Sequence, residues 1–187
     1  MKYSNQWLIE KYQQEEQIKF LFFWGHRPTR DGSISASCFS QWWPADFVVN
    51  DITYKTAEHW MMAGKARLFN DEVVFGKIIK CTEPGEAKKL GREISNFDPA
   101  TWDEHKFNIV VEGNVFKFSQ HQPLQDFLLN TQNRVLVEAS PVDSIWGNGM
   151  AADHPDINNP LKWKGQNLLG YALMEVRDKL MKNGRTI

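Results

Sequence analysis

The sequence predicts an α+β fold, a compact and mostly helical single domain with a few short strands. Hydrophobic residues make up 42% of the 187 residues and aromatic residues 13%, which favours a packed globule over a disordered chain. Segments with helical spacing of apolar residues outnumber segments with strand character. The short β-branched and aromatic runs are scattered between these helices, and this arrangement is typical of the α+β class.

Four short segments have strand character. Residues 18–24 form a β-branched and aromatic run that predicts the first strand. Residues 47–49 and 52–54 flank Asn50-Asp51 and predict a hairpin of two short strands. Residues 134–138 alternate and are rich in β-branched residues, which predicts a further strand.

The helices are expected from residue 56 onward. Thr56 is a suitable N-cap for a helix over residues 57–69. A third segment, residues 84–94, has Pro84 in its first turn and Thr82 as the expected cap. Further helices are predicted at residues 71–80, 102–118 and 123–130, and from about Asn167 through Val176. The first 16 residues are charged and Gln-rich and predict a peripheral segment 1–16, which leaves residues 17–187 as the domain.

Charge and cysteine content restrict the class of protein. The 22 basic and 23 acidic residues give a net charge of -1, which does not suggest long-range attraction to nucleic acid or to an anionic membrane. Cys38 and Cys81 have no paired spacing, and the first residues do not resemble a secretion signal. Because no apolar run is long enough to span a bilayer, we expect a cytoplasmic protein without a membrane partner.

The helix after Thr56 carries two ionisable residues on an apolar stripe. Glu58 and Lys65 share one face with Met61, Met62 and Phe69, about two turns apart or roughly 10 Å along the axis. Burying either charge is unfavourable unless the group is paired, hydrated in a cleft or shifted in pKa. The alternative is that one or both side chains lie at the edge of the stripe and extend to water. Helix geometry alone leaves both interpretations open.

The second motif is the segment Asp-Ser-Ile-Trp-Gly-Asn-Gly at residues 143–149. Gly147 and Gly149 permit positive φ and close backbone approach, as a turn beside a ligand requires. Trp146 offers a flat face for a heterocycle or a sugar, and Asp143 can stabilise positive charge or activate water. The alternative is an ordinary surface turn with Trp146 packed in the core. The motif is not a dinucleotide fingerprint, since the third glycine is missing.

Two further positions are candidates for contact with an anion. Gly165-Gln166-Asn167 precedes a predicted helix and can present backbone N–H groups, although Asn167 can equally be a simple N-cap. Arg92 can contact a phosphate, or it can belong to a solvated helix face. The five histidines lack two-ligand helical spacing and no local cysteine-nucleophile signature is found, so we expect neither a metal nor another cofactor.

Many short motifs follow one another in a fixed order from about residue 20 to about residue 180. The motifs are Phe39-Ser40, Tyr54-x-Thr56-x-Glu58-His59, Lys65-Ala66, Leu90-Gly91-Arg92, Trp102, Lys117-Phe118, Leu136-Val137-Glu138, Asp143-x-x-Trp146-Gly147-x-Gly149, Gly165-x-Asn167-x-Leu169-Gly170 and Leu173-Met174-x-Val176-Arg177. Each motif is weak alone, and the ordered set is specific. As a set they resemble the YbiA/NADAR family, which is also found fused to riboflavin-biosynthesis enzymes.

The resemblance implies hydrolysis of N-glycosidic bonds without a metal or redox cofactor. Members of the family cleave phosphoribosylamino-pyrimidine intermediates of riboflavin synthesis, and other branches remove ADP-ribose from guanine bases. The expected partner is therefore a small phosphoribosyl or ADP-ribosyl substrate, and nucleic acid only where it carries ADP-ribose. The segments 25–37 and 150–161 exceed those of the shortest members and affect the choice of substrate. A non-catalytic module that binds ADP-ribose or a related nucleotide is the alternative from another class.

The family match and the shared helix face together suggest roles for these residues. Lys65 is the preferred nucleophile, which forms a Schiff base with the opened ribosylamine, and Glu58 shuttles protons. Asp143 is a second acid/base or binds ribose hydroxyls. In a competing mechanism Glu58 and Asp143 form a carboxylate pair and Lys65 only neutralises phosphate. The expected substrate-binding residues are Trp146, Gly147, Gly149, Asn167, Arg92, Trp102 and Ser40.

Overall fold

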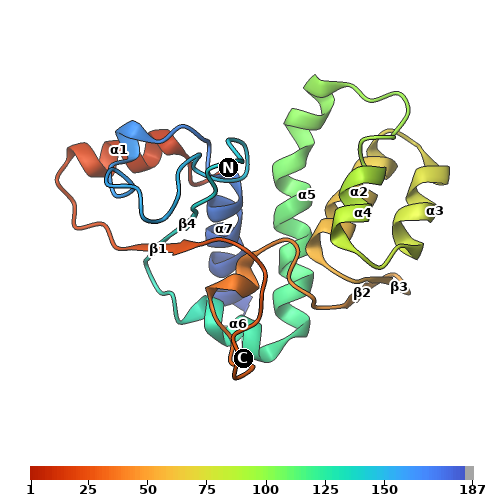
Figure 1. Cartoon of the computed structure of the whole chain (residues 1–187), viewed down its shortest axis with the longest axis horizontal. Helices are drawn as coiled ribbons and strands as arrows, with labels where there is room; N and C mark the ends of the chain where they lie inside the picture. The colour runs from red at the N-terminus through yellow and green to blue at the C-terminus, as the bar shows by residue number, and fades with distance from the viewer. Residues whose placement is uncertain (184–187) are drawn as a thin grey trace. The chain divides into compact units, whose positions relative to one another are not determined.

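The computed structural model describes residues 1–183, so the last four residues of the expected 17–187 domain lie outside the described residues. It confirms the α+β class, with helices predominating over a few short strands (Figure 1). The chain is divided into two compact units, which we describe separately. The first unit holds residues 1–40 and 123–187, and the second unit holds residues 41–122.

The second unit begins with the predicted hairpin. Strands β2 (Phe47–Val49) and β3 (Ile52–Tyr54) pair antiparallel, with Phe47 opposite Tyr54. Asn50 and Asp51 adopt φ angles of 49° and 61°, as the two central residues of a tight hairpin turn require. Both tolerate the left-handed region better than most residues do, which explains why this pair marks the turn in the sequence.

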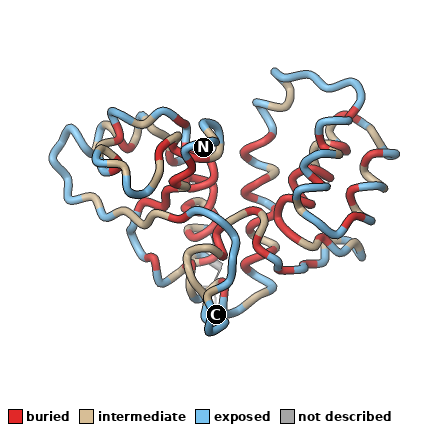
Figure 2. Tube along the Cα trace, in the orientation of Figure 1, coloured by how far each residue is buried: buried red, intermediate tan, exposed pale blue. Residues whose placement is uncertain are grey.

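Helix α2 (Ala57–Leu68) lies at the centre of the second unit. Thr56 caps it as predicted, since its side chain accepts a hydrogen bond from the backbone N–H of His59. The helix packs against α3 (Glu72–Lys80), α4 (Pro84–Leu90), α5 (Pro99–Gln120) and β3. Because neighbours cover several sides, residues 57–63 are all buried, and the buried surface is wider than the predicted stripe (Figure 2).

The bounds of α4 differ from the prediction. The helix ends at Leu90 rather than at residue 94, and its N-cap is Glu83 rather than Thr82. Pro84 occupies the first helical turn, so Thr82 lies one residue too early to be the cap. Beyond Gly91 the chain leaves the helix, and Asp71 accepts hydrogen bonds from the backbone N–H and hydroxyl of Ser95.

The first unit is built around two parallel strands that are distant in the sequence. Strand β1 (Phe20–Phe23) pairs with β4 (Val135–Glu138), so both strands agree with the prediction. Helix α7 (Leu168–Asn183) packs against β4, and buried Arg177 donates hydrogen bonds to the Thr131 hydroxyl and the Arg134 carbonyl. The remaining elements of the chain are α1 (Asn5–Gln13), η1 (Ala36–Phe39), α6 (Gln122–Leu129) and η2 (Pro160–Lys162).

Helix α1, which belongs to the segment 1–16, contributes to the core of the first unit. Leu8 is fully buried, and Asn5 donates a hydrogen bond to the Gly165 carbonyl and accepts one from the Tyr171 hydroxyl. These contacts tie the start of the chain to residues that precede and begin α7.

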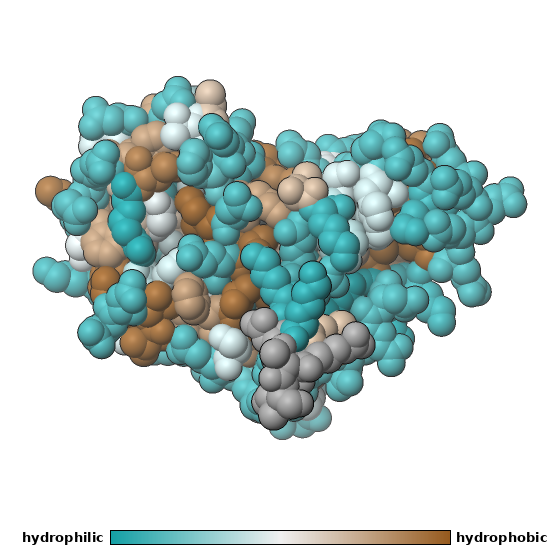
Figure 3. Space-filling view, turned by 180° about the vertical axis from the view of Figure 1, so that it is seen from behind, coloured by the Kyte–Doolittle hydropathy of each residue, from teal (hydrophilic) through white to brown (hydrophobic). Residues whose placement is uncertain are grey.

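On the face shown in Figure 3, hydrophilic residues predominate and apolar residues are interspersed among them. The large apolar side chains that are exposed include Trp24, Val73, Phe97 and Val142. Within residues 1–183, none of the helices combines the length and the apolar character needed to cross a membrane.

Candidate functional site

The amine of Lys65 occupies a defined position in the second unit. Its Nζ donates a hydrogen bond of 2.8 Å to the carbonyl oxygen of Gly91. The same atom lies 4.1 Å from the ring centroid of Phe97 and 5.5 Å from that of Trp102. The structure therefore brings together two predicted site residues, Lys65 and Trp102, with the segment that carries Arg92. No pattern in the sequence identified Phe97.

Local packing explains why the Gly91 carbonyl lies beside Lys65. Gly91 is the C-cap residue of α4, where the chain turns away from the helix. A Cβ at this position would lie only 2.1 Å from the Met62 sulfur, so a side chain here would force Met62 to move. The absence of a side chain lets the end of α4 approach α2 closely.

The surroundings of Lys65 affect its protonation in two directions. The side chain is half-buried, and this burial lowers the pKa of the Lys65 amine from its ordinary value of 10.5. The carbonyl oxygen and the aromatic faces favour the ammonium form, because both present negative potential to it. A lysine with a lowered pKa is a better nucleophile at neutral pH, since more of it is present as the free amine.

Glu58 lies in the first turn of α2 and is only 3% exposed. The interpretation that it reaches water at the edge of the stripe is therefore wrong for this residue. Its backbone N–H donates to the carbonyl oxygen of Gln41 at 2.9 Å. The start of a helix favours a carboxylate, because the backbone dipoles leave partial positive charge there. Glu58 and Lys65 thus belong to one helix, with the carboxylate near its start and the amine in its last turn.

Two buried amides that the sequence did not reveal hold the start of α2. Asn114 of α5 is fully buried and donates 2.7 Å to the side-chain oxygen of Gln41, whose amide nitrogen donates to the Ala57 carbonyl. Lys117, three residues after Asn114 and so on the same side of α5, is also fully buried. The pattern in the sequence that could have identified this cluster is a pair of polar residues at i and i+3 on the otherwise apolar face of a predicted helix.

Arg92 lies one residue after Gly91, and its side chain is exposed. Its backbone N–H donates to the Lys89 carbonyl at the end of α4. The guanidinium therefore stands at the surface next to the segment that binds the Lys65 amine, where an exposed cation can meet a phosphate.

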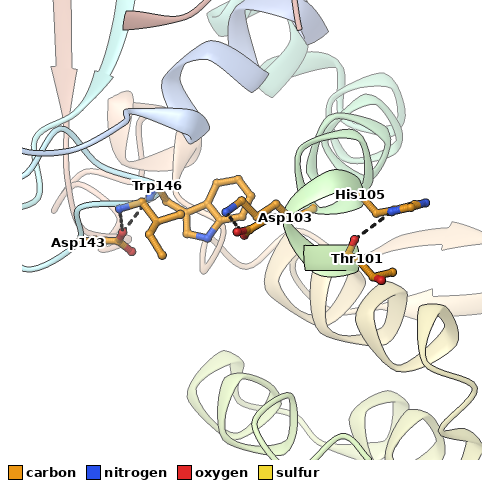
Figure 4. A network of polar contacts seen from close by, with 7 residues as sticks. Thr101, Asp103, His105, Asp143 and Trp146 are labelled. Carbon is orange, nitrogen blue, oxygen red and sulfur yellow. Dashed lines mark hydrogen bonds and ion pairs between the residues drawn. The ribbon is translucent and has the colours of Figure 1, made fainter. Parts of the chain in front are cut away.

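In the first unit, Asp143 organises the loop that precedes Trp146. One carboxylate oxygen accepts hydrogen bonds from the backbone N–H groups of Ile145 and Trp146, at 2.9 and 2.8 Å (Figure 4). An aspartate that accepts from the residues two and three positions later stabilises a local turn. One carboxylate oxygen of Asp143 thus stabilises this turn. The Trp146 side chain, which belongs to the same turn, is half-buried.

Both glycines of this loop are required by geometry. Gly149 has a φ of +74°, as the sequence suggested. Gly147 has no positive φ, but a Cβ there would lie 2.8 Å from the Asp143 carbonyl oxygen and 2.9 Å from that of Glu138. Close approach of backbone to backbone therefore explains Gly147.

Asn167 is used to join the loop to β4. Its side-chain oxygen accepts from the Glu138 N–H, and its side-chain nitrogen donates to the Leu136 carbonyl, each at 3.0 Å. The backbone N–H groups of residues 166–169, at the start of α7, donate to the carbonyl oxygens of residues 144–147. These N–H groups are engaged within the unit, and the side chain bonds β4 rather than capping the helix.

The remaining predicted residue, Ser40, lies in the first unit at the end of η1, where its backbone N–H donates to the Ser37 carbonyl. The second unit thus holds Glu58, Lys65, Arg92 and Trp102, and the first holds Ser40 together with the loop residues from Asp143 to Asn167. In the part of the chain that the structure describes, no group of three or more His, Cys, Asp or Glu side chains could hold a metal ion.

Comparison with known proteins identifies the family. Residues 22–181 match the NADAR domain. A protein of Acanthamoeba polyphaga mimivirus named an N-glycosidase is 45% identical over 170 residues, which covers 88% of this chain and 98% of that protein. The N-glycosidase YbiA of Escherichia coli is 33% identical over 138 residues, with 74% and 76% covered.

A solved structure supports the same assignment. The NMR structure of the E. coli protein YbiA matches with a TM-score of 0.70 and 28% identity, and the match covers 91% of this chain and 90% of that one. Because the domain match spans most of the chain and the fold agrees, the chain belongs to the NADAR family.

Proposed function

We propose that this chain is an N-glycosidase that hydrolyses the bond between ribose 5-phosphate and the amino group of a phosphoribosylamino-pyrimidine. The observation that carries the proposal is the partly desolvated Lys65 amine, which is oriented by Gly91 and by two aromatic rings. The relatives named N-glycosidases in a mimivirus and in Escherichia coli support the hydrolase class.

Lys65 acts in this proposal through a Schiff base. The opened ribosylamine, protonated at its imine nitrogen, presents an iminium carbon, and the neutral amine adds to it to form a new carbon–nitrogen bond. A proton passes from the lysine nitrogen to the nitrogen of the pyrimidine amine, and the bond to the pyrimidine then breaks. Water adds to the resulting lysine imine, and release of the aldehyde sugar returns the free amine.

Glu58 moves protons in these steps, since general acid–base catalysis needs a group that can both give and accept a proton. The roles expected from the sequence for Asp143, as a further acid/base or a ligand of ribose hydroxyls, and for Trp146, as a stacking face for the base, stay predictions. Arg92 meets the phosphate. The partner is a small phosphoribosyl compound, and no nucleic acid is required.

A second candidate substrate has the same linkage chemistry, namely ADP-ribose attached to guanine. The exposed Arg92 guanidinium next to the Lys65 segment suits a diphosphate as well as a monophosphate. The two substrates differ in the size of the base and in the second nucleoside, which other surfaces must accommodate.

Product analysis tests the proposal. The pure protein is incubated with each phosphoribosylamino-pyrimidine and with ADP-ribosylated guanosine, and release of base and sugar is followed by mass spectrometry. Lys65→Ala and the exposed control Lys80→Ala are treated alike. Release that requires Lys65 supports the proposal and selects the substrate. Tight binding without release from any substrate would make the chain a nucleotide-binding module.

A further inference from the structure

Phe97 lies closer to the Lys65 amine than Trp102 does, and neither the sequence nor the comparisons assign it a role. Its ring centroid is 4.1 Å from Nζ. The residue sits in the segment 91–98 between α4 and α5, and the first residue of this segment, Gly91, supplies the carbonyl oxygen that binds the same amine. One short segment therefore contacts Lys65 at both of its ends.

The Phe97 ring is fixed by its packing. It meets Phe69 edge-on, with centroids 5.3 Å apart, and Phe69 is the buried C-cap residue of α2. Phe97 as a whole is 41% exposed. The ring thus closes one side of Lys65 against water while its other side is open to solvent.

We propose that Phe97 is a positioning residue for Lys65, whose amine it holds against the Gly91 carbonyl and shields from water. The ring has two opposite effects on the stability of the ammonium form of Lys65. Its face attracts the ammonium form, because the aromatic quadrupole is negative there. Its bulk excludes water and so disfavours the ammonium form. Removing the ring face alone should therefore raise the fraction of free amine at Lys65, and admitting water in addition should lower that fraction again.

The charged groups near this segment do not explain why the pKa of the Lys65 amine is lowered. Arg92, Glu93 and Asp98 lie within the segment, and Asp98 accepts hydrogen bonds from Thr101 at the start of α5. Asp103 and Lys106, one turn further along α5, form an ion pair with each other. Within the second unit, burial is the cause that lowers the pKa of Lys65.

The test measures Lys65 itself and needs no substrate. The whole protein is labelled competitively with acetic anhydride from neutral to alkaline pH, and the extent of reaction at Lys65 is read by peptide mass spectrometry. Phe97→Leu keeps the bulk but removes the ring face, so we expect Lys65 to react roughly two- to fivefold faster near neutral pH. Phe97→Ala also loses the ring face and in addition admits water, so we expect Lys65 to react more slowly in Phe97→Ala than in Phe97→Leu.

The matched control is Phe75→Leu. The Phe75 ring also lies beside a cation in the second unit, 5.0 Å from the Arg67 guanidinium, but the variant leaves Phe97 in place. Labelling of Lys65 should match the wild type in this variant. If both Phe97 variants also match the wild type, the proposal is overturned.

The kinetic consequence rests on the proposed function. The acidic limb of kcat/KM against pH should move to lower pH in Phe97→Leu, and in Phe97→Ala it should lie at higher pH than in Phe97→Leu. Labelling shifts without any glycosidase activity would support the role of Phe97 and reject the proposed function. Activity that depends on Lys65, with labelling unchanged by either Phe97 variant, would reject the role of Phe97 alone.

Discussion

The side-chain oxygen of Asn167 accepts a hydrogen bond from the backbone N–H of Glu138 at 3.0 Å, and its side-chain nitrogen donates to the Leu136 carbonyl at the same distance. The amide group of one residue thus pairs with β4 as a neighbouring strand would. Since the Asn167 backbone N–H donates to the Gly147 carbonyl, this pairing ties the loop that carries Asp143 and Trp146 to strand β4.

Asn167→Ala should therefore lower the stability of the fold. The substitution leaves a backbone N–H and a carbonyl of β4 without partners in a buried place, and each such loss costs about 1–3 kcal/mol. Alanine also tolerates the φ of +52° at this position less well than asparagine. We expect urea unfolding to show a loss of about 3 kcal/mol. The control is Asn158→Ala, which changes an exposed asparagine. An equal loss of stability in both variants would reject this role for Asn167.

Two glycines in helices should respond to alanine in opposite ways. A Cβ at Gly113 of α5 would lie 2.2 Å from Cδ1 of Trp60, whose ring nitrogen is bonded to the Ile109 carbonyl and so is not easily displaced. Gly113→Ala should destabilise the protein by about 2–3 kcal/mol. A Cβ at Gly76 of α3 has no atom within 4 Å, so Gly76→Ala should stabilise by about 0.5–1 kcal/mol. Thermal unfolding of both variants measures the difference, and a loss of stability in Gly76→Ala would contradict the packing described for α3.

The lowered pKa of Lys65 makes stability depend on pH. In the folded protein this amine loses its proton at a lower pH than in the unfolded chain, where its pKa is 10.5. Between these two values the unfolded state binds more protons, so the free energy of unfolding rises with pH. The difference in stability between wild type and Lys65→Met should therefore move in favour of the wild type as pH rises from neutral towards 10.5. Urea unfolding of both proteins across this range measures it. A difference that stays constant with pH would show that the Lys65 pKa is not lowered by folding.

Glu58→Gln tests the proton shuttle without removing bulk. Glutamine keeps the shape of glutamate but cannot exchange a proton, so kcat should fall by about 10²- to 10⁴-fold. A buried neutral amide at the start of α2 should leave the melting temperature close to that of the wild type. The control Glu112→Gln changes an exposed carboxylate of α5 and should leave kcat unchanged. Full activity in Glu58→Gln would exclude both mechanisms that use this carboxylate.

Features determined by residues close in the sequence could be predicted. Asn50-Asp51 marks the hairpin because these residue types accept positive φ, and Thr56 marks the start of α2 because its hydroxyl bonds the N–H three residues later. The cap of α4 was misplaced because Pro84 fixes the first turn, so the cap position falls on Glu83, which makes no side-chain capping bond.

Features that depend on distant contacts could not be predicted. Asn167 and Glu138 are far apart in the sequence, and the choice between a helix cap and a strand partner is decided only when α7 packs against β4. The partners of Lys65 come from a segment 26 and more residues later, so helix spacing could place the lysine on a stripe but could not identify Phe97. Gln41 and Asn114 are likewise brought together only by packing.

The most direct test of the account is to trap the Schiff base at Lys65. The protein is mixed with the substrate it cleaves, reduced with borohydride during turnover and analysed by peptide mass spectrometry. We expect the reduced sugar phosphate to be attached to the peptide that contains Lys65, and Lys65→Ala to give neither adduct nor product. Turnover without an adduct at Lys65 would contradict the Schiff-base mechanism. It would favour the mechanism in which Glu58 and Asp143 act as a carboxylate pair.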